Sequence, residues 1–516
     1  DAKTLTHSML DELTFDFNYL LWICCIIVLL FLFLSFGRAE LTLLTFAPMA
    51  IAFIWILGMM AIFDIRFNII NIILTTFIFG IGDDYSIFIM EGLIYEYAYG
   101  KKMLTSYKTA VILSAVTMFT GIGALIIARH PAMFSLAQVT IIGMIAVAVI
   151  AYTVAPFIFK WLTMAKGQKR RMPVTLWNLT KTAVSFLVFL IFSLALTLAG
   201  FLLLTIGRKS KVNKLRFHKC ICSVFRILSK IMIEVPVKVL NEHKENFEKP
   251  GIIICNHQSH LDLMYTLMLS PKIICLTNEW VSKSPLYGWI LRYADFYPVA
   301  NGIEQSIKQL RTAIENGYSI LVFPEGTRSE DCSIGRFHKG AFYLAEQLQV
   351  DIIPVVVHGI GHFFPKNEFM SRRGRVTIQI LERIACGNEL RTGKEYYEIA
   401  KAVRHFYQQA YQRLAAQCET VSYFTDLVKH NYIYKGAGIA RAVRRSLKNN
   451  HCFEEAIAAM PDEGCYHISH CGYGEFPLLA ALVKKRLQIT ASDPDEEKML
   501  LAANCAAVPD NLKYTI

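Results

Sequence analysis

The sequence predicts a multidomain membrane protein: an α-helical transmembrane bundle of five spans with one further anchoring or re-entrant helix, then an α/β domain, then a partial Rossmann-like α/β segment. Three observations lead to this fold class. Apolar runs dominate the first third of the 516 residues, of which 54% are hydrophobic and only 18% charged. Short β-branched runs then alternate with helical patterns. A glycine-containing turn follows a strand-like run near the end.

Changes in composition predict the domain boundaries. The apolar bundle is followed by a basic linker, a second apolar stretch, a long α/β region and a shorter one. The predicted segments are 1–17 (the end of an extracytoplasmic domain), 18–165 (the transmembrane bundle), 166–182 (the basic linker), 183–235 (membrane-anchoring helices), 236–415 (the α/β domain) and 416–516 (the Rossmann-like segment).

The five apolar runs are long enough to cross hydrocarbon, for which a helix needs roughly 20 residues. Nine lysines and arginines fall in the loops on one side, but only Arg66 and Arg129 on the other. The positive-inside rule therefore places the first side in the cytoplasm and residue 1 outside. The runs lie near 18–36, 41–63, 67–90, 109–128 and 136–159.

A sixth apolar run, 183–206, has basic residues at both ends. If it crossed the membrane, one basic cluster and everything after it would lie on the outer side. The alternative is a re-entrant or interfacial helix, with 215–235 as an amphipathic partner in the headgroup region. We favour the second interpretation.

The net charge and the cysteine spacing limit which ligands the chain is expected to bind. A formal net charge of +12 suits nucleic acid or anionic lipid, and the membrane segments favour lipid, so we expect no nucleic acid. The thirteen cysteines include no C-x-x-C pair, which supports neither a zinc site nor a disulfide framework. We expect no metal.

Two carboxylates, Asp83 and Asp84, lie inside the third apolar run and precede Tyr85. Ionisable groups are costly inside a bilayer and usually mark an ion or proton path. The alternative is a pair that reaches the cytoplasmic interface from the helix end. We take Asp83, Asp84 and Tyr85 as proton-relay candidates.

With this pair, residues 1–165 resemble the RND superfamily, in particular its MMPL-type lipid exporters. Asp84 and Tyr85 match the family's relay pair, and the five runs match spans eight to twelve. The resemblance implies a missing N-terminal transporter half, without which this chain transports nothing. It also implies a multi-pass protein of the bacterial inner (cell) membrane, with the α/β domain in the cytoplasm.

The first motif of the α/β domain is Asn256-His257-Gln258-Ser259-His260-Leu261-Asp262, directly after the apolar run 251–255. In α/β folds, ligand sites lie at the carboxyl ends of strands. A neutral His257 can take a proton from an attacking hydroxyl, and Asp262 can orient its ring across a strand-to-helix turn. No serine or cysteine nucleophile is evident, so direct transfer is simpler than a covalent intermediate. Alone, this spacing is a common chance pattern.

The second motif, Phe323-Pro324-Glu325-Gly326-Thr327-Arg328-Ser329, ends another apolar run. Arg328 can form paired hydrogen bonds with phosphate or carboxylate. Backbone N–H groups of the glycine turn add anion contacts. A structural turn with a surface ion pair is the alternative for this motif alone.

Together and in this order, the two motifs resemble the glycerolipid acyltransferases, best known as lysophosphatidate (1-acyl-glycerol-3-phosphate) acyltransferases of the PlsC type. The resemblance covers about 215–415. It implies that His257 is the catalytic base, that Asp262 orients it, and that the donor is acyl-CoA or acyl-ACP, with no tightly bound cofactor. The substrate-binding residues that it implies are Asn256, Ser259, Glu325, Gly326, Thr327, Arg328 and Lys339.

One part departs from the family. Asn301 stands where an arginine normally helps to bind phosphate. Losing a charge-assisted contact costs about 1.5–3 kcal/mol, so a lyso-aminolipid or another polar lyso-lipid is a credible acceptor. Lys308, Arg311, His338 or Lys339 could compensate.

The segment 416–516 contains Cys471-Gly472-Tyr473-Gly474-Glu475 after a strand-like run and Asp493 about 20 residues later. This pattern resembles class I S-adenosylmethionine (SAM)-dependent methyltransferases, in which Gly472 and Gly474 would line the cofactor loop and Asp493 would hold the ribose. Ile468 and His470 replace the usual acidic residue and first glycine, so we expect a degenerate or truncated remnant without bound SAM.

The leading hypothesis is a membrane-bound O-acyltransferase that acts on a lyso-lipid and is fused to a lipid-exporter half. The first alternative is a transporter component whose acyltransferase acts on an exported non-phosphate lipid or is accessory. The second is a lipid-binding module without catalysis, which the presence of His257, Asp262, Glu325 and Arg328 disfavours.

Overall fold

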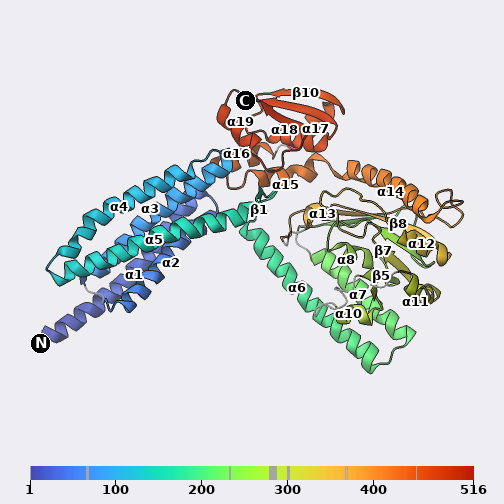
Figure 1. Cartoon of the computed structure of the whole chain (residues 1–516), viewed down its shortest axis with the longest axis horizontal. Helices are drawn as coiled ribbons and strands as arrows, with labels where there is room; N and C mark the ends of the chain where they lie inside the picture. Colours follow the sequence, from blue (N-terminus) through green and yellow to red (C-terminus); the bar gives the residue numbers. More distant parts are fainter. Residues whose placement is uncertain are drawn as a thin grey trace. The chain divides into compact units, whose positions relative to one another are not determined.

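The computed structural model describes residues 2–65, 69–231, 234–277, 288–298, 303–366, 368, 370–448 and 450–515. The chain forms two compact units (Figure 1). The first combines Asp1–Leu176 with Phe424–Ile516, and the second is Trp177–Tyr423. Asn301, the departure from the family pattern, lies outside the described residues.

The first unit begins with five long helices that pack side by side (Figure 1). Their connections are short, so neighbours run in opposite directions. Pro131 at the first turn of the fifth helix suits a position whose N–H would have no helical partner. The helices are α1 (Ala2–Phe36), α2 (Ala39–Ile62), α3 (Ile69–Tyr99), α4 (Leu104–Gly123), which continues as the 3-10 turn η1 (Ala124–Ile127), and α5 (Pro131–Thr163).

Four stretches in the described part of the chain are long and apolar enough to cross a membrane. Three of them, Ala39–Ile62, Leu104–Ile127 and Pro131–Thr163, coincide with predicted spans, and the fourth, Leu176–Ile206, contains the sixth apolar run. The apolar part of α1, Trp22–Phe36, is shorter. The first predicted run is therefore helical but short by this measure, and part of the third lies outside the described residues.

The second unit begins with a helical hairpin. Helix α6 (Leu176–Gly200) continues as the π-helical turn η2 (Phe201–Ile206), and α7 (Lys211–Ile231) follows. Thr182, near the start of α6, contacts Ser371 through its hydroxyl at 3.2 Å. At the other end, Gly200 packs so closely on Tyr293 and Phe217 that a β-carbon there would lie 2.5 Å from the Tyr293 ring. Both ends of α6 therefore contact the same domain.

A seven-stranded sheet forms the centre of the second unit, in the order β3-β9-β8-β4-β7-β5-β6. Only the β8–β9 pair is antiparallel. Every residue of β4 and β8 is buried, as expected for strands covered on both faces. The strands are β3 (Val237–Leu240), β4 (Gly251–Cys255), β5 (Ile273–Thr277), β6 (Tyr297–Pro298), β7 (Ser319–Val322), β8 (Asp351–His358) and β9 (Val376–Ile380).

The helices of this domain cover the sheet (Figure 1) and follow the alternation of strand and helix patterns expected from the sequence. The longest, α14, starts with a capping box in which Glu395 and Glu398 satisfy each other's backbone N–H groups. The helices are α8 (Asp262–Leu267), α10 (Gly288–Tyr293), α11 (Ile303–Glu315), α12 (Gly340–Gln347), α13 (Ile360–Phe363) and α14 (Tyr396–Cys418).

The chain ends in a small parallel sheet of three strands in the order β10-β11-β12. It belongs to the first unit, where the Asn504 amide donates to the carbonyls of Tyr97 and Ala98 at 2.9 and 3.0 Å. The elements are β10 (Gly464–Ser469), β11 (Leu487–Ser492), β12 (Leu512–Thr515), α15 (Val421–Asn431), α16 (Ala437–Ser446), α17 (Asn450–Ala459), α18 (Glu475–Val483) and α19 (Glu496–Ala503).

Candidate active site

His257 and Asp262 face each other across the turn between β4 and α8. His257 Nδ1 lies 2.8 Å from Asp262 Oδ2. The same oxygen accepts the backbone N–H groups of Gln258 and Ser259 at 2.6 and 2.8 Å. Because two backbone donors hold this oxygen as an acceptor, Nδ1 carries the hydrogen of the imidazole bond, and Nε2 is left to accept a proton.

The exposure of the pair suits an acid–base role. The His257 side chain is 24% exposed and that of Asp262 only 1%. The imidazole stacks on Phe323, with 4.4 Å between ring centroids. The carboxylate is thus shielded from water, and one edge of the ring is accessible.

Glu325 joins the two motifs. Its Oε1 accepts the backbone N–H of His257 at 3.0 Å, and its Oε2 accepts that of Gly335 at 2.8 Å. Ser329 N–H donates to the His257 carbonyl at 2.8 Å. The backbone of His257 is therefore held from both sides by the second motif, because β4 and β7 are adjacent and parallel.

Burial raises the pKa of Glu325, although the backbone donors of His257 and Gly335 act in the opposite direction. A β-carbon at Gly335 would lie 2.8 Å from Glu325 Oε2. Only glycine therefore allows the backbone to approach this carboxylate so closely.

The glycine turn of the second motif places the side chain of Arg328 at the surface of the site. Gly326 has φ of +67°, a left-handed conformation that favours glycine, and both Gly326 and Thr327 are exposed. Arg328 is partly exposed and makes no hydrogen bond or ion pair with any residue that the structure describes. Its guanidinium is thus available to an anion.

His260 belongs to the same charged group and was not singled out from the sequence. Burial first, and then the charges of Arg328 and His257, lower its pKa, while Asp262 acts against them. His260 lies three residues after His257, and Arg328 directly precedes Ser329, whose N–H binds the His257 carbonyl, so both lie close to the catalytic pair. The second histidine of the first motif, three residues after His257, was the available signal.

The remaining predicted substrate-binding residues differ in exposure. Lys339 is exposed at the start of α12. Asn256 and Ser259 are fully buried and contact the chain itself. The Asn256 amide exchanges two 2.8 Å hydrogen bonds with the backbone of Val357 on β8.

Ser259 is a residue type that often caps a helix, but it does not cap α8. Instead α8 starts at Asp262, and the Ser259 hydroxyl makes only a long 3.4 Å bond with Leu261 N–H. Asp262 instead accepts the N–H groups of Gln258 and Ser259, which hold the turn before the helix.

The tyrosines of α14 and the role of Gln258 were not predicted from the sequence. Tyr407 OH bonds to Asn256 N–H at 2.9 Å and to the carbonyl of Val355 at 2.6 Å. Gln258 Nε2 donates to Tyr411 OH and to the Cys332 carbonyl, both at 2.9 Å. These tyrosines lie 150 residues or so beyond the motif, so no local pattern could reveal them.

The other predicted site residues lie in the first unit. Asp83, Asp84 and Tyr85 are on α3, with Asp84 exposed and Tyr85 buried. Asp493, after β11, accepts the N–H of Gly472 at 2.8 Å and that of Asp495 at 3.0 Å. A β-carbon at Gly474 would meet Ala502 at 2.6 Å. Gly474 is therefore needed for internal packing, and both Asp493 oxygens already have backbone partners.

Comparison with known proteins agrees with this geometry. Residues 237–358 match the protein family described as Acyltransferase. A 1-acyl-sn-glycerol-3-phosphate acyltransferase of Saccharomyces cerevisiae is 32% identical over 189 residues, 35% of this chain and 61% of that protein. One from Chlamydomonas reinhardtii is 33% identical over 141 residues, 26% of this chain and 42% of that protein. The matched part thus spans less than two thirds of these relatives.

Among solved structures, the 1-acyl-sn-glycerophosphate acyltransferase PlsC of Thermotoga maritima is similar, with 23% sequence identity and a TM-score of 0.41. The match covers 47% of this chain and 97% of that one. The family and sequence matches confirm the enzyme class expected from the two motifs, an acyltransferase: residues 237–358 match the Acyltransferase family, and the matched relatives are 1-acyl-sn-glycerol-3-phosphate acyltransferases.

Proposed function

We propose that this domain transfers a fatty acyl group from an acyl thioester to the hydroxyl of a lyso-lipid. His257 Nε2 accepts the hydroxyl proton as the oxygen attacks the thioester carbonyl. The C–O bond of the new ester forms and the C–S bond breaks. The imidazolium then gives its proton to the departing thiolate, so coenzyme A or acyl carrier protein leaves as a free thiol.

One observation carries this proposal: the 2.8 Å contact between His257 Nδ1 and Asp262 at the end of β4. Asp262 stabilises the imidazolium and keeps the tautomer that exposes Nε2. In this mechanism Glu325 and Asn256 hold the loop that carries His257, while Gly326, Thr327 and Lys339 line the acceptor's approach. Ser259 contributes its backbone N–H to Asp262.

The test is acyl transfer from acyl-CoA and from acyl-ACP to a panel of lyso-lipids by the purified full chain. We expect His257→Ala to reduce turnover at least about 1,000-fold, because it removes the base. His243→Ala, at an exposed histidine of the same domain, is the matched control and should match wild type. Equal product from wild type and His257→Ala would refute the mechanism.

For the acceptor we propose a lyso-lipid with an anionic headgroup, such as 1-acyl-glycerol-3-phosphate. The partly exposed guanidinium of Arg328 beside the catalytic pair supports this, as do the names of the relatives. Arg328→Ala should raise KM for lysophosphatidate about tenfold or more and leave KM for a neutral lyso-lipid unchanged. If the neutral acceptor is preferred by wild type, a non-phosphate lipid is the substrate.

We propose further that α6 lies along the membrane surface and does not cross it. Contacts of Thr182 and of Gly200 with the same domain support this, since the two ends of a spanning helix lie on opposite sides of a bilayer. The outer face of α6 exposes large apolar side chains, including Phe186, Leu194 and Leu198. Such a helix anchors a domain at the interface.

The lipid-exporter half is a proposal that rests on the carboxylates of α3, beside the buried Tyr85. In this second proposal, the chain is part of a transporter that exports the product of the acyl transfer or another lipid. Asp84→Asn should leave acyl transfer unchanged and stop lipid export by cells that carry the whole transporter. Normal export by this variant would remove the relay role.

A further inference from the structure

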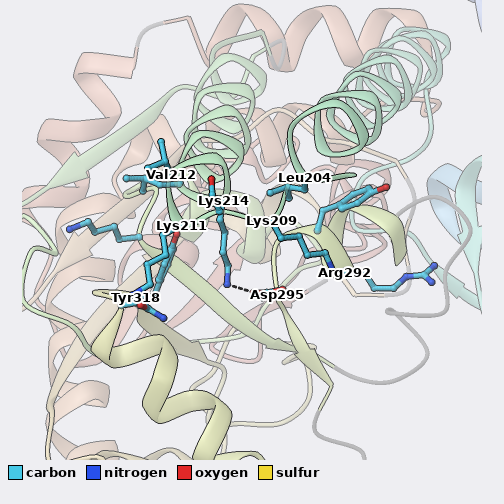
Figure 2. Close-up of a pocket in the computed structure, with 13 residues that line it drawn as sticks. Leu204, Lys209, Lys211, Val212, Lys214, Arg292, Asp295 and Tyr318 are labelled. Carbon is cyan, nitrogen blue, oxygen red and sulfur yellow. Dashed lines mark hydrogen bonds and ion pairs between the residues drawn. The ribbon is translucent and has the colours of Figure 1, made fainter. Parts of the chain in front are cut away.

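The second unit, Trp177–Tyr423, contains the acyltransferase domain and is called the acyltransferase unit below. A cavity of about 470 Å³ lies in it, where the α6–α7 hairpin meets the sheet domain (Figure 2). One side is formed by the end of η2 and the start of α7, and the other by the residues that precede β5 and β7 and follow α10. Its size suits a small ligand or a lipid headgroup.

Positive charge dominates this cavity. Five cationic side chains line it, Lys209, Lys211, Lys214, Lys272 and Arg292, against the single carboxylate of Asp295. That carboxylate pairs with Lys214, as the dashed line in Figure 2 shows. Within the described part of the chain, Lys209, Lys211 and Lys272 make no ion pair. A hollow lined mainly by cations raises the local concentration of anions.

The cavity is distinct from the candidate active site. Lys272 and Tyr318 directly precede β5 and β7, whereas His257 and Glu325 follow β4 and β7. Because these strands are parallel, the cavity lies at the amino-terminal edge of the sheet and the catalytic residues at the carboxyl-terminal edge. The four residues of β7 separate the two edges by roughly 13 Å.

Exposed apolar side chains lie on η2 and at the start of α7, the two elements that form one side of the cavity. Ile206 and Val212, on either side of the basic corner, are 65% and 60% exposed, and Leu202 is 50% exposed. Figure 2 shows Val212 directed away from the Lys214–Asp295 pair. Basic groups next to exposed apolar groups are the arrangement that an anionic lipid meets at a bilayer surface, with its phosphate on the cations and its chains beside the apolar residues. A free phosphate ion would need no such apolar border.

We propose that this cavity binds the phosphate headgroup of an anionic phospholipid, which fixes the α6–α7 corner to the membrane at a site separate from the catalytic one. The proposal does not depend on the acceptor of the acyl transfer. It predicts that an anionic phospholipid that is neither substrate nor product binds saturably to the full chain.

The test uses phosphatidylglycerol as the probe, with phosphatidylcholine as the neutral comparison, in neutral-detergent mixed micelles containing the purified full chain. Wild type should bind phosphatidylglycerol more tightly than phosphatidylcholine. The triple substitution Lys209→Gln, Lys211→Gln and Lys272→Gln should weaken this binding at least tenfold, since each cation near a lipid surface is worth about fivefold. The double substitution Lys219→Gln and Lys230→Gln removes two exposed lysines of α7 outside the cavity and should bind normally.

Arginine at the same three positions preserves the charge and should preserve binding, which separates loss of charge from misfolding. Soluble glycerol 3-phosphate should compete poorly, because it lacks acyl chains. Unchanged binding by the triple glutamine variant, or an equal loss in the Lys219/Lys230 control, would overturn the proposal. Equal competition by glycerol 3-phosphate would show that a free phosphate is the ligand. Since the probe is not acylated, these results do not depend on whether acyl transfer is detected.

Discussion

Asp262 is the residue on which the geometry of the candidate active site depends most. One of its oxygens serves the imidazole and two backbone N–H groups at once. This arrangement fixes the ring, its tautomer and the turn that carries both residues. Chemistry and local folding therefore rest on the same carboxylate, and a substitution there affects both.

Asp262→Asn should lower kcat about 100- to 10,000-fold, because an amide cannot stabilise the imidazolium and can turn its N–H₂ toward the ring. It should also lower stability by about 1–3 kcal/mol, since backbone donors lose a charged acceptor. Single-turnover kinetics and thermal unfolding of the full chain measure the two effects. A variant with wild-type kcat would show that Asp262 only shapes the turn.

His358 provides a pH dependence of stability away from the candidate site. Burial lowers its pKa, but the neighbouring Cys418 and the hydrogen bond and charge of Glu419 outweigh this effect and leave the pKa raised. His358 Nε2 lies 3.0 Å from Glu419. The stabilisation is complete below the unfolded pKa of about 6.5 and is lost as pH rises through the higher folded value. Thermal midpoints should therefore fall from pH 6 upward in wild type and less so in His358→Gln. Parallel pH profiles would contradict this assignment.

At the scale of elements, the ends of the strands decide where the site lies. Adjacent parallel strands β4 and β7 bring His257 and Glu325 to one edge of the sheet. Helix α14 packs over β8 and adds Tyr407, whose hydroxyl ties the Asn256 loop to β8. The site is therefore assembled from three elements distant in sequence, and the turns at their ends are its most sensitive points.

The turn after β8 is the sharpest of these. Gly359 has φ of +94°, and a β-carbon there would lie 2.0 Å from the Arg375 carbonyl oxygen on the neighbouring strand connection. Gly359→Ala should cost at least about 3 kcal/mol through strain and displaced backbone. Gly387→Ala, in an exposed turn with open space around it, should be nearly neutral. Thermal or denaturant unfolding compares the two, and equal midpoints would show that the backbone at 359 adapts freely.

At the scale of the whole molecule, the central question is on which side of the membrane the acyltransferase unit lies. If α6 is interfacial, the unit shares the side of the loop between α3 and α4. If α6 crosses the bilayer, the acyltransferase unit lies on the side opposite to that loop. The charge of the loops predicts that the α3–α4 loop is cytoplasmic. The proposed use of acyl-CoA or acyl-ACP therefore favours the interfacial arrangement.

Single cysteines introduced into a chain whose native cysteines are replaced by serine can test this. Lys101→Cys, in the loop after α3, and Thr392→Cys, on the acyltransferase unit, are both at exposed positions. In sealed inside-out vesicles, both should react with a membrane-impermeant maleimide, and Arg129→Cys should not. Protection of Thr392→Cys together with labelling of Lys101→Cys would show that α6 spans.

The sequence alone determined the features that depend on local patterns. Buried parallel strands need continuous β-branched runs, and such runs mark the positions of β4, β7, β8 and β9. The two motifs follow β4 and β7 directly, so their meeting at one sheet edge was also predictable. The sequence and family matches then confirmed the acyltransferase class that those motifs indicated.

Tertiary structure decided what depends on long-range contacts. The hydrogen bonds that Asn256 N–H and Gln258 Nε2 donate to Tyr407 and Tyr411 join residues far apart in sequence. So does Glu325, which links the two motifs. The same holds for the basic cavity, whose lysines come from the η2–α7 connection, from α7 and from the turn before β5. A local pattern of residues predicts which face of a helix or strand is apolar. Only the folded chain brings turns that are far apart in sequence within hydrogen-bond distance.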